Sequence, residues 1–315
     1  MKNIKCMVCA FSAFVAVSIS AWSFVLEPVI FSVRSYPSFL IVDVSTCGVG
    51  NQMFHYAAGM GYARQNMGYV VCVLGLEDDV INAGHNMSVF RLVVDVIDSP
   101  LESCPSNVSG RKLPFFKRGI NIGWMEYFTP PHSMFKPFEI GGGRSVFVEG
   151  CMQSYKYFQS VPHPFFRPKQ LDAAKAWMSN RTGISSVVHV RRGDKVMDGS
   201  VVAPVEYYEK VLRMLGTSYV AVCTDDPAWV RQQRVFQNAT ISSGEPSFDM
   251  ALMASATEAV VIGTGTFGWW GAYLSNAKRK YFYRLQYTGE LANGYREQDY
   301  IPRGVSGQGQ WIGLI

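Results

Sequence analysis

The sequence has 315 residues, of which 48% are hydrophobic and 17% are charged, so most of the chain is expected to fold around a core. It has no repeat period and no low-complexity tract, which excludes solenoid and collagen-like architectures. The net charge of +5 is mild and the basic residues are scattered, so no nucleic-acid partner is expected. A modest positive balance suits an anionic small ligand equally well.

The N-terminus carries a long uncharged segment. Residues 1–5 include two lysines, and residues 6–26 contain no charged side chain. A helix of about 20 apolar residues spans a bilayer, and the positive-inside rule places the lysines in the cytoplasm. We therefore expect a cytoplasmic tail over 1–5, a signal-anchor helix over 6–26 and a short stem over 27–38, with the rest of the chain lumenal. A cleavable signal peptide with a site near Ser18 and Ser20 is the alternative.

Sequons and cysteines bear on the same compartment. Four N-x-S/T sequons agree with a lumenal chain and predict N-glycosylation at Asn86, Asn107, Asn180 and Asn238. Five of the seven cysteines lie outside residues 6–26, with no C-x-x-C pair and no zinc-binding spacing among them, so no metal site is expected. Because five is odd, at least one cysteine stays unpaired or bridges another chain, and the pairing is left open.

The first half of the body has the pattern of a parallel sheet. An apolar run over 39–45 ends at a glycine-rich turn, 47–51, which leads into a predicted helix over 52–66. A second apolar run at 69–74 completes a βαβ unit. A further strand is expected at 145–149. We expect an N-terminal Rossmann-like domain on the acceptor side, covering residues 39–165.

Strands and helices alternate more regularly in the second half. The predicted strands are 184–190, 219–223, 258–263 and 279–284, and the predicted helices are 205–215, 227–234, 247–256 and 268–276. Asp226 before Pro227, and Ser247, are the expected helix caps. The pattern predicts a doubly wound α/β domain over 166–315, which binds its ligand at the carboxyl ends of the strands. The predicted fold class is therefore α/β, with two Rossmann-like domains facing a cleft.

Two arginines follow the strand at 184–190. Arg191 and Arg192 stand at its carboxyl end, between His189 and Asp194. Arginine makes forked contacts to phosphate, so this motif is a candidate phosphate site. The alternative is that Arg192 and Asp194 simply brace a solvated turn.

Two glycine-rich turns are further candidates. Gly48 and Gly50 allow close backbone approach before a helix N-terminus, although the turn matches no nucleotide fingerprint and is otherwise just tight. The turn over 263–268 presents hydroxyls and N–H groups at a strand end. Trp269 and Trp270 stack on a sugar or lie in the core. Asp225 and Asp226 meet a ribose or cap the next helix.

Together, five stretches resemble glycosyltransferase family 11, the α1,2-fucosyltransferases. They are GVGNQMFHYA (48–57), EGCMQSYKYF (149–158), HVRRGD (189–194), CTDD (223–226) and TGTFGWWGAYLS (264–275). The resemblance implies a GT-B fold, a type II position in the Golgi membrane, GDP-β-L-fucose as donor, a glycan acceptor and inversion at the anomeric carbon. The arginine motif also occurs in α1,6- and protein O-fucosyltransferases, so it marks GDP-fucose use more than linkage.

The resemblance also implies residue roles. Arg191 contacts the donor β-phosphate, and the chain lacks a D-x-D motif, which agrees with a transferase that needs no metal or other cofactor. His189 and Asp194 orient the loop. Further substrate-binding candidates are Gly48, Gly50, Asn51, Gln52, Gln153, Arg192, Asp225, Asp249, Thr264, Thr266 and Phe267. Candidates for the base that accepts the acceptor proton are Asp194, Asp198, Glu149 and His55.

Some residues depart from the family pattern. Val49 and His55 replace a leucine and a glutamine, threonines replace serines before the tryptophans, and residues 150–154 lack two aromatic residues. These departures concern acceptor preference more than donor use. The alternative functions are a fucosyltransferase of α1,6 or protein O-linkage and a catalytically inactive, membrane-tethered glycan-binding protein.

Overall fold

The computed structural model of the chain describes residues 38–43, 48–66, 69–74, 93–96, 125–128, 134–137, 145–148, 152–159, 166–287 and 296–315. Within these ranges, no helix combines the length and apolar character needed to cross a bilayer. The predictions for the tail over 1–5 and the anchor over 6–26 lie outside the described residues, and so do Asn86, Asn107 and Glu149.

The first sheet has four parallel strands in the order β2-β1-β5-β4. The strands are β1 (Ser38–Asp43), β2 (Tyr69–Leu74), β4 (Met125–Phe128) and β5 (Ser145–Val148). Helix α2 (Val49–Gln65) leads from β1 to β2, so the predicted βαβ unit is confirmed, with the helix beginning at Val49 rather than Gln52. The chain leaves β1 on one side for β2 and has β5 on the other side, so the topological switch point lies between β1 and β5.

The second sheet has six strands, all parallel, in the order β12-β11-β10-β7-β8-β9. The strands are β7 (Ser186–Val190), β8 (Ala221–Thr224), β9 (Thr240–Ile241), β10 (Ala259–Ile262), β11 (Arg279–Tyr283) and β12 (Gln310–Leu314). This is the strand order of a doubly wound nucleotide-binding sheet, with its switch point between β7 and β10. The α/β class and the predominantly parallel sheet are confirmed, whereas the division into two domains at 165/166 stays a prediction.

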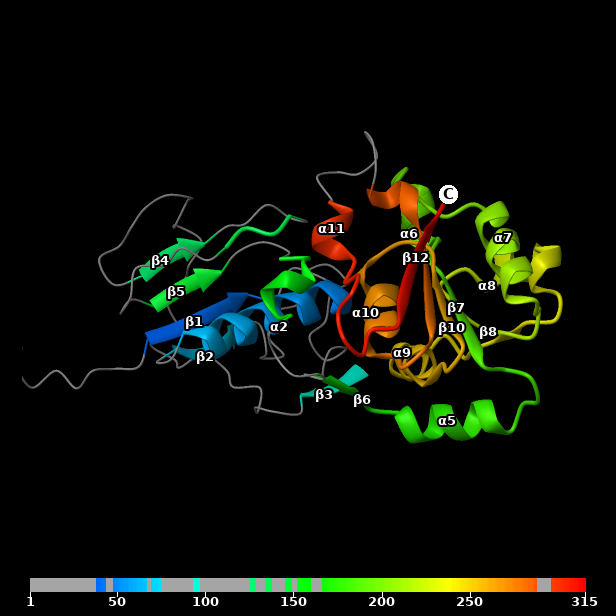
Figure 1. Cartoon of the computed structure of the whole chain (residues 1–315), viewed down its shortest axis with the longest axis horizontal. Coiled ribbons are helices and arrows are strands. Elements are labelled where there is room, and N and C mark those ends of the chain that lie inside the picture. The colour runs from blue at the N-terminus through cyan, green and yellow to red at the C-terminus, as the bar shows by residue number, and fades with distance from the viewer. Residues whose placement is uncertain are drawn as a thin grey trace, which may run out of the picture. The chain divides into compact units, whose positions relative to one another are not determined.

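Helices cover both faces of the second sheet (Figure 1). They are α9 (Pro246–Ser255) and α10 (Thr266–Leu274) on one face and α7 (Val205–Leu215) and α8 (Pro227–Gln232) on the other. The other helices of this part are α5 (Leu171–Ser179), which packs on α9, α6 (Gly193–Met197) and α11 (Glu297–Tyr300). Short 3-10 turns η2 (Tyr155–Tyr157), η3 (Arg234–Phe236) and η4 (Arg284–Tyr287) and a small antiparallel pair, β3 (Val94–Val96) with β6 (Phe166–Pro168), complete the described elements.

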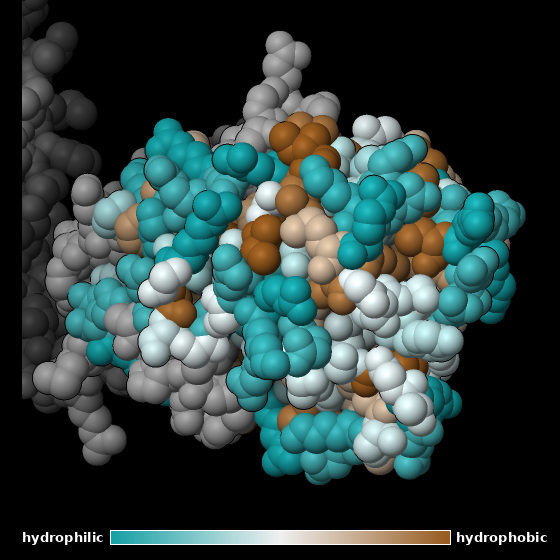
Figure 2. Space-filling model, turned by 45° about the vertical axis from the view of Figure 1, so that its right-hand side comes forward, coloured by the Kyte–Doolittle hydropathy of each residue, from teal (hydrophilic) through white to brown (hydrophobic). Residues whose placement is uncertain are grey.

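Alternate residues of each strand point into two different cores. Val187 and Ile262 pack with α9 and α10, whereas Val188 and Val261 pack with α7 and α8. Because side chains alternate between the two faces and both faces are buried, the strands are continuous apolar runs in the sequence. On the face shown in Figure 2, hydrophobic side chains surface in separate places among hydrophilic ones.

Candidate active site at the switch point of the second sheet

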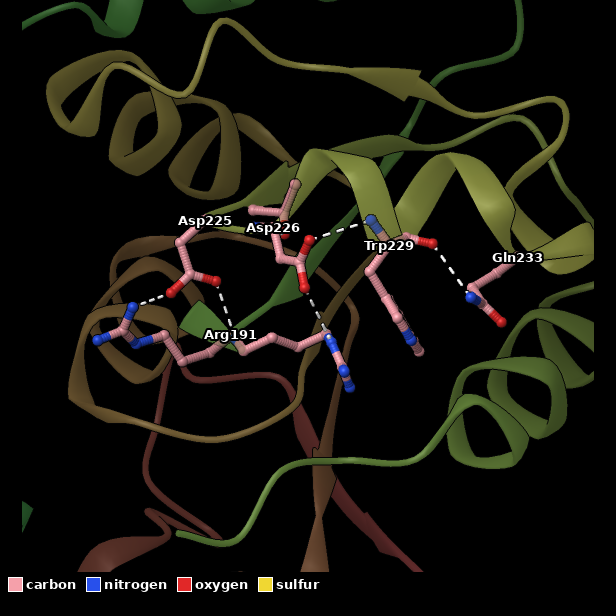
Figure 3. Close-up of polar contacts among 7 residues, drawn as sticks. Arg191, Asp225, Asp226, Trp229 and Gln233 are labelled. Carbon is pink, nitrogen blue, oxygen red and sulfur yellow. Dashed lines mark hydrogen bonds and ion pairs between the residues drawn. The ribbon is translucent and has the colours of Figure 1, made fainter. Parts of the chain in front are cut away.

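Arg191 follows β7 at the switch point and is held by two carboxylates. Its Nη1 donates to Asp225, which follows the neighbouring strand β8 (Figure 3). Its Nη2 lies 2.5 Å from Asp194 Oδ1. About a third of its side chain is exposed, 32%. The guanidinium is therefore fixed in direction while one part of it remains open to a ligand.

Asp225 is the residue that fixes this direction. While Oδ2 accepts from Arg191, Oδ1 accepts the backbone N–H of Arg192 at 2.8 Å. Gly193 is required beside it, because a Cβ at that position would lie 2.6 Å from Asp225 Oδ2. Asp225 thus orients the arginine loop, a role that neither the ribose nor the capping hypothesis assigned to it.

Arg192 has a different environment from Arg191. Its Nε lies 3.3 Å from Asp226 Oδ2, and its guanidinium lies 4.1 Å from the ring centroid of Trp229. Asp226 caps α8 as predicted, accepting the N–H of Trp229 at 3.0 Å (Figure 3). Arg192 therefore braces α8, in line with the bracing alternative, but through Asp226 and not Asp194.

The turn between β10 and α10 lies against the stem of Arg191. Gly265 has φ +90, which favours glycine, and a Cβ there would lie 3.9 Å from Arg191 Cγ. The hydroxyl of Thr264 is buried and has no partner among the described residues. Because α10 begins at Thr266, its positive dipole end faces the same edge as Arg191.

Helix α2 also brings its N-terminus to this turn. A Cβ on Gly50 would lie 2.6 Å from Phe267 N and from Thr266 Oγ1, and Trp270 Nε1 donates to Gly50 O at 2.9 Å. The predicted close backbone approach at Gly50 is thus made to α10. Trp269 and Trp270 are both buried in the core, so the sugar-stacking alternative does not describe their position here.

His189 stands at the end of β7, under α10. Burial and the charge of Arg191 lower its pKa to about 3, so the imidazole is neutral at physiological pH. A Cβ on Gly268 would lie 2.5 Å from its Nδ1, so the ring fills a notch that glycine leaves in the first turn of α10. Its predicted role in orienting the arginine loop remains a prediction.

The chain is also similar in sequence to known proteins. The family model described as glycosyl transferase family 11 matches residues 117–299. A mouse protein named galactoside 2-alpha-L-fucosyltransferase Sec1 is 36% identical over 91% of this chain and 77% of its own length. The chain belongs to glycosyl transferase family 11. It is therefore a glycosyltransferase.

The chain is similar to further glycosyltransferases. A Caenorhabditis elegans galactoside 2-alpha-L-fucosyltransferase is 22% identical over 81% of this chain and 75% of its own length. An alpha-1,2-colitosyltransferase of Escherichia coli is 26% identical over 73% of this chain and 85% of its own length. The relatives therefore differ in the sugar that their names specify.

Asp249 of the family 11 enzyme lies on α9, behind β8. The Ser242 hydroxyl donates to its carboxylate, and Cys223 Sγ donates to its backbone carbonyl at 3.7 Å. Burial raises the pKa of Asp249 to about 6. Cys223 is a buried free thiol whose pKa burial also raises. The predicted guanine contact of Asp249 remains a prediction.

The candidate bases differ in their surroundings. Asp194 is exposed and paired with Arg191, whereas Asp198 ends α6 in solvent and accepts the N–H of Ser200 at 2.8 Å. Hydrogen bonds from Ser200 lower the pKa of Asp198, as do the nearby charges of Lys195 and Arg191. His55 is buried within α2, so it lies away from solvent.

At the first switch point, two amides meet. Asn51 lies in the first turn of α2, after β1, and Gln153 follows β5. Gln153 Nε2 donates to Asn51 Oδ1 at 2.9 Å, while Gln52 beside them is buried. Gly48 is exposed and precedes α2 as its N-cap. These predicted substrate-binding residues are therefore brought together on the first sheet.

Several residues of the site were missed. Gly193 leaves room for Asp225, Trp229 packs on the guanidinium of Arg192, and Gln286 Oε1 accepts the N–H of Gly265 at 3.2 Å. The glycine inside the motif was a usable signal, but nothing local marks Gln286, which comes from another strand end. No group of three or more His, Cys, Asp or Glu residues that could hold a metal ion occurs in the described part of the chain.

Both described sequons are accessible. Asn180 is exposed at the end of α5, and Asn238 is exposed beside β9, where its Nδ2 donates to Ser218 Oγ at 2.9 Å. Their predicted glycosylation is not tested by this geometry.

Proposed function

We propose that the protein transfers L-fucose from GDP-β-L-fucose to the 2-hydroxyl of a terminal galactose on glycans, giving an α1,2-fucoside. Relatives named for this activity include the mouse and Caenorhabditis elegans proteins. The observation that carries the proposal is Arg191, whose guanidinium is aimed by Asp225 at the switch point where doubly wound sheets bind nucleotides.

Arg191 would stabilise the departing diphosphate. Negative charge develops on GDP as its bond to the fucose anomeric carbon breaks, and a preoriented guanidinium lowers the energy of that state. The N-termini of α10 and α2 meet beside it and add favourable dipoles. These fixed positive groups support a mechanism that needs no metal ion.

The acceptor hydroxyl attacks from the opposite side and gives up its proton to a carboxylate. Asp198 is exposed and negatively charged at neutral pH, as a general base must be, while the hydrogen bonds from Ser200 that lower its pKa make it a weaker base. Asp194 is the second candidate. Because Asp194 shares Arg191 with the expected diphosphate, donor binding would loosen this ion pair and free the carboxylate. A single displacement of this kind converts a β-linked donor into an α-linked product.

The wider architecture is part of the proposal. The chain would be a single-pass type II Golgi membrane protein with the catalytic part lumenal, which the uncharged run at 6–26 and the sequons support. The GT-B arrangement is supported by two separate parallel sheets, each with its own switch point.

The test is a transfer assay with GDP-fucose and a panel of galactosides, xylosides and N-glycan cores, followed by NMR of the product. The expected product is an α1,2-fucosylgalactoside, formed also in the presence of EDTA. An α-fucoside at another hydroxyl would refute the linkage alone. A β-fucoside, or activity abolished by EDTA and restored by Mn²⁺, would refute the mechanism. Glycan binding without GDP release would favour the inactive binding protein.

A further inference from the structure

Asp299 in α11 joins three segments that are distant in sequence (α11 is labelled in Figure 1). Its side chain is buried, with Oδ1 2.6 Å from Lys156 Nζ and Oδ2 accepting the N–H of Phe135 at 3.2 Å. Its backbone carbonyl accepts the Ser154 hydroxyl at 2.5 Å. One residue thus supplies three acceptors to segments 134–137 and 152–159.

The segment that Asp299 holds has a strained backbone. Met152 has φ +40 although it is neither glycine nor asparagine, and its side chain is fully buried. Ser154 N donates back to Met152 O at 2.8 Å, which tightens the chain around Gln153. A bulky residue stays in this region only when its surroundings enforce it, and strain of this kind concentrates at functional sites. The contacts of Asp299 with Ser154 and Lys156 are part of that enforcement.

The residue enclosed by this tight turn is Gln153. Its side chain donates to Asn51 across the switch point between β5 and β1. Asn51 adjoins Gly50, whose backbone contacts α10 at the edge that carries Arg191. Asp299 is therefore connected through Ser154, Gln153 and Asn51 to the candidate active site.

We propose that Asp299 is a positioning residue for acceptor binding: it fixes the turn at 152–154 so that Gln153 and Asn51 present a rigid amide pair to acceptor hydroxyls. This inference rests on the proposed function. Amide groups donate and accept at once, which matches sugar hydroxyls, and a neutral pair adds no repulsion to the anionic donor. Asp299 itself is buried and acts only through these residues.

A purely structural role for Asp299 predicts a different result, and α11 provides a matched control. Glu297 lies two residues earlier in the same short helix and is also doubly paired, with Arg303 Nη2 at 2.5 Å and Arg284 Nε at 2.7 Å. Arg284 follows β11 and Arg303 follows α11, so neither partner belongs to the turn at 152–154. Loss of either carboxylate removes ion pairing from α11. Only Asp299 contacts the turn that contains Gln153, through Ser154 and Lys156.

The experiment compares Asp299→Asn with Glu297→Gln in the full chain. We measure the KM for a galactoside acceptor, the KM for GDP-fucose and the melting temperature. The expected result for Asp299→Asn is an acceptor KM raised about tenfold, the size of one lost charged hydrogen bond, with the GDP-fucose KM within about twofold. Glu297→Gln should leave both KM values unchanged. Ser154→Ala, which removes the other link to Asp299, should also raise the acceptor KM and spare the donor KM.

Each other outcome counts against the inference. Equal changes in both KM values for Asp299→Asn, or the same acceptor effect in Glu297→Gln, would show that α11 merely supports the fold. If Asp299→Asn does not fold, Ser154→Ala decides, and an unchanged acceptor KM in it overturns the proposal. Failure of the wild-type chain to fucosylate any galactoside would overturn the proposed function itself. Active wild-type protein with an unaffected Asp299→Asn variant overturns only this inference.

Discussion

The two switch points of the molecule differ in charge. The one in the second sheet holds Arg191 between Asp194 and Asp225, whereas the one in the first sheet holds a neutral pair, Asn51 and Gln153. The same parallel topology thus carries ionic groups in one region and amides in the other. A diphosphate suits the first and sugar hydroxyls suit the second, so the proposed function predicts donor binding at the second sheet and acceptor binding at the first.

The contacts between the regions explain how they act together. Gly50 meets the first residues of α10, and Trp270 bonds to its carbonyl, so the N-termini of α2 and α10 are in contact. Neither helix could approach so closely with a side chain at position 50. The difference in charge between the regions therefore predicts separable effects, donor affinity on one side and acceptor affinity on the other.

The largest effect is expected at the ionic region. Arg191→Ala removes the preoriented positive charge that is proposed to stabilise the departing GDP. Loss of such a contact costs about 2.7–4 kcal/mol, or a 10²–10³-fold loss in kcat. Arg191→Lys should also be impaired because a point charge cannot reproduce the fork. Steady-state kinetics with GDP-fucose, together with a melting curve to confirm folding, measure this.

The control is Arg167→Ala, an exposed arginine paired at 3.5 Å with Asp172. It should retain activity. A folded Arg191→Ala variant with near-normal kcat would remove the assigned role and with it the distinction between the two regions.

The region of the second sheet should also show a pH dependence of its stability, because Asp249 of α9 is a buried carboxylate. Burial raises the pKa of Asp249 to about 6 from 3.8, so the folded chain holds this proton more tightly than the unfolded chain. The stabilisation is complete below pH 3.8 and is lost as pH rises through 6, by roughly 2–3 kcal/mol. Asp249→Asn should flatten this decline in urea unfolding between pH 4 and 7.

The readout is the difference between slopes, because other carboxylates titrate in the same range. Asp172→Asn on α5 reports the effect of losing an exposed carboxylate. Identical pH slopes for wild type and Asp249→Asn would show that Asp249 is not the group responsible.

The fold was predictable where local signals agree. From residue 184 onward, apolar runs and turn residues alternate, and Asp226 before Pro227 caps α8 as predicted. The predicted cap at Ser247 is wrong. Helix α9 begins at Pro246 because the Glu245 carboxylate accepts the N–H groups of Ser247 at 3.2 Å and Phe248 at 2.9 Å. Gln170, from another segment, donates to that carboxylate at 2.7 Å, and no local pattern shows it.

The candidate site was predictable in membership but not in roles. The motif predicted a shared role for Arg191 and Arg192. In the structure Arg191 pairs with Asp225, whereas Arg192 packs on Trp229. Their separation depends on partners that follow β8, a strand brought alongside only by the sheet. The same holds for Gln153 and Asn51, whose hydrogen bond spans 102 positions of sequence. Roles set by such distant pairs require the tertiary structure.

A smaller effect is expected from the residue that aims Arg191. Asp225→Asn keeps the shape but removes the charge, so the guanidinium loses one of its two carboxylate partners. Because Asp225 is partly exposed, we expect about 1.4 kcal/mol, or a tenfold rise in the GDP-fucose KM. Gly193→Ala, which crowds Asp225 Oδ2, should act in the same direction. A changed acceptor KM with an unchanged donor KM would contradict the assignment of Asp225 to the donor side.

The smallest effect is expected at the amide pair. It tests most directly whether the first sheet binds the acceptor and not the donor. A neutral hydrogen bond contributes about 0.5–1.5 kcal/mol, so Asn51→Ala and Gln153→Ala should each raise the acceptor KM about two- to tenfold. Because the two side chains bond to each other at 2.9 Å, the double variant should lose less than the sum of the single losses. Isothermal titration with GDP should give unchanged affinity in all three variants. Additive losses would show that the pair does not act as a unit, and a weakened GDP affinity would place the amides on the donor side instead.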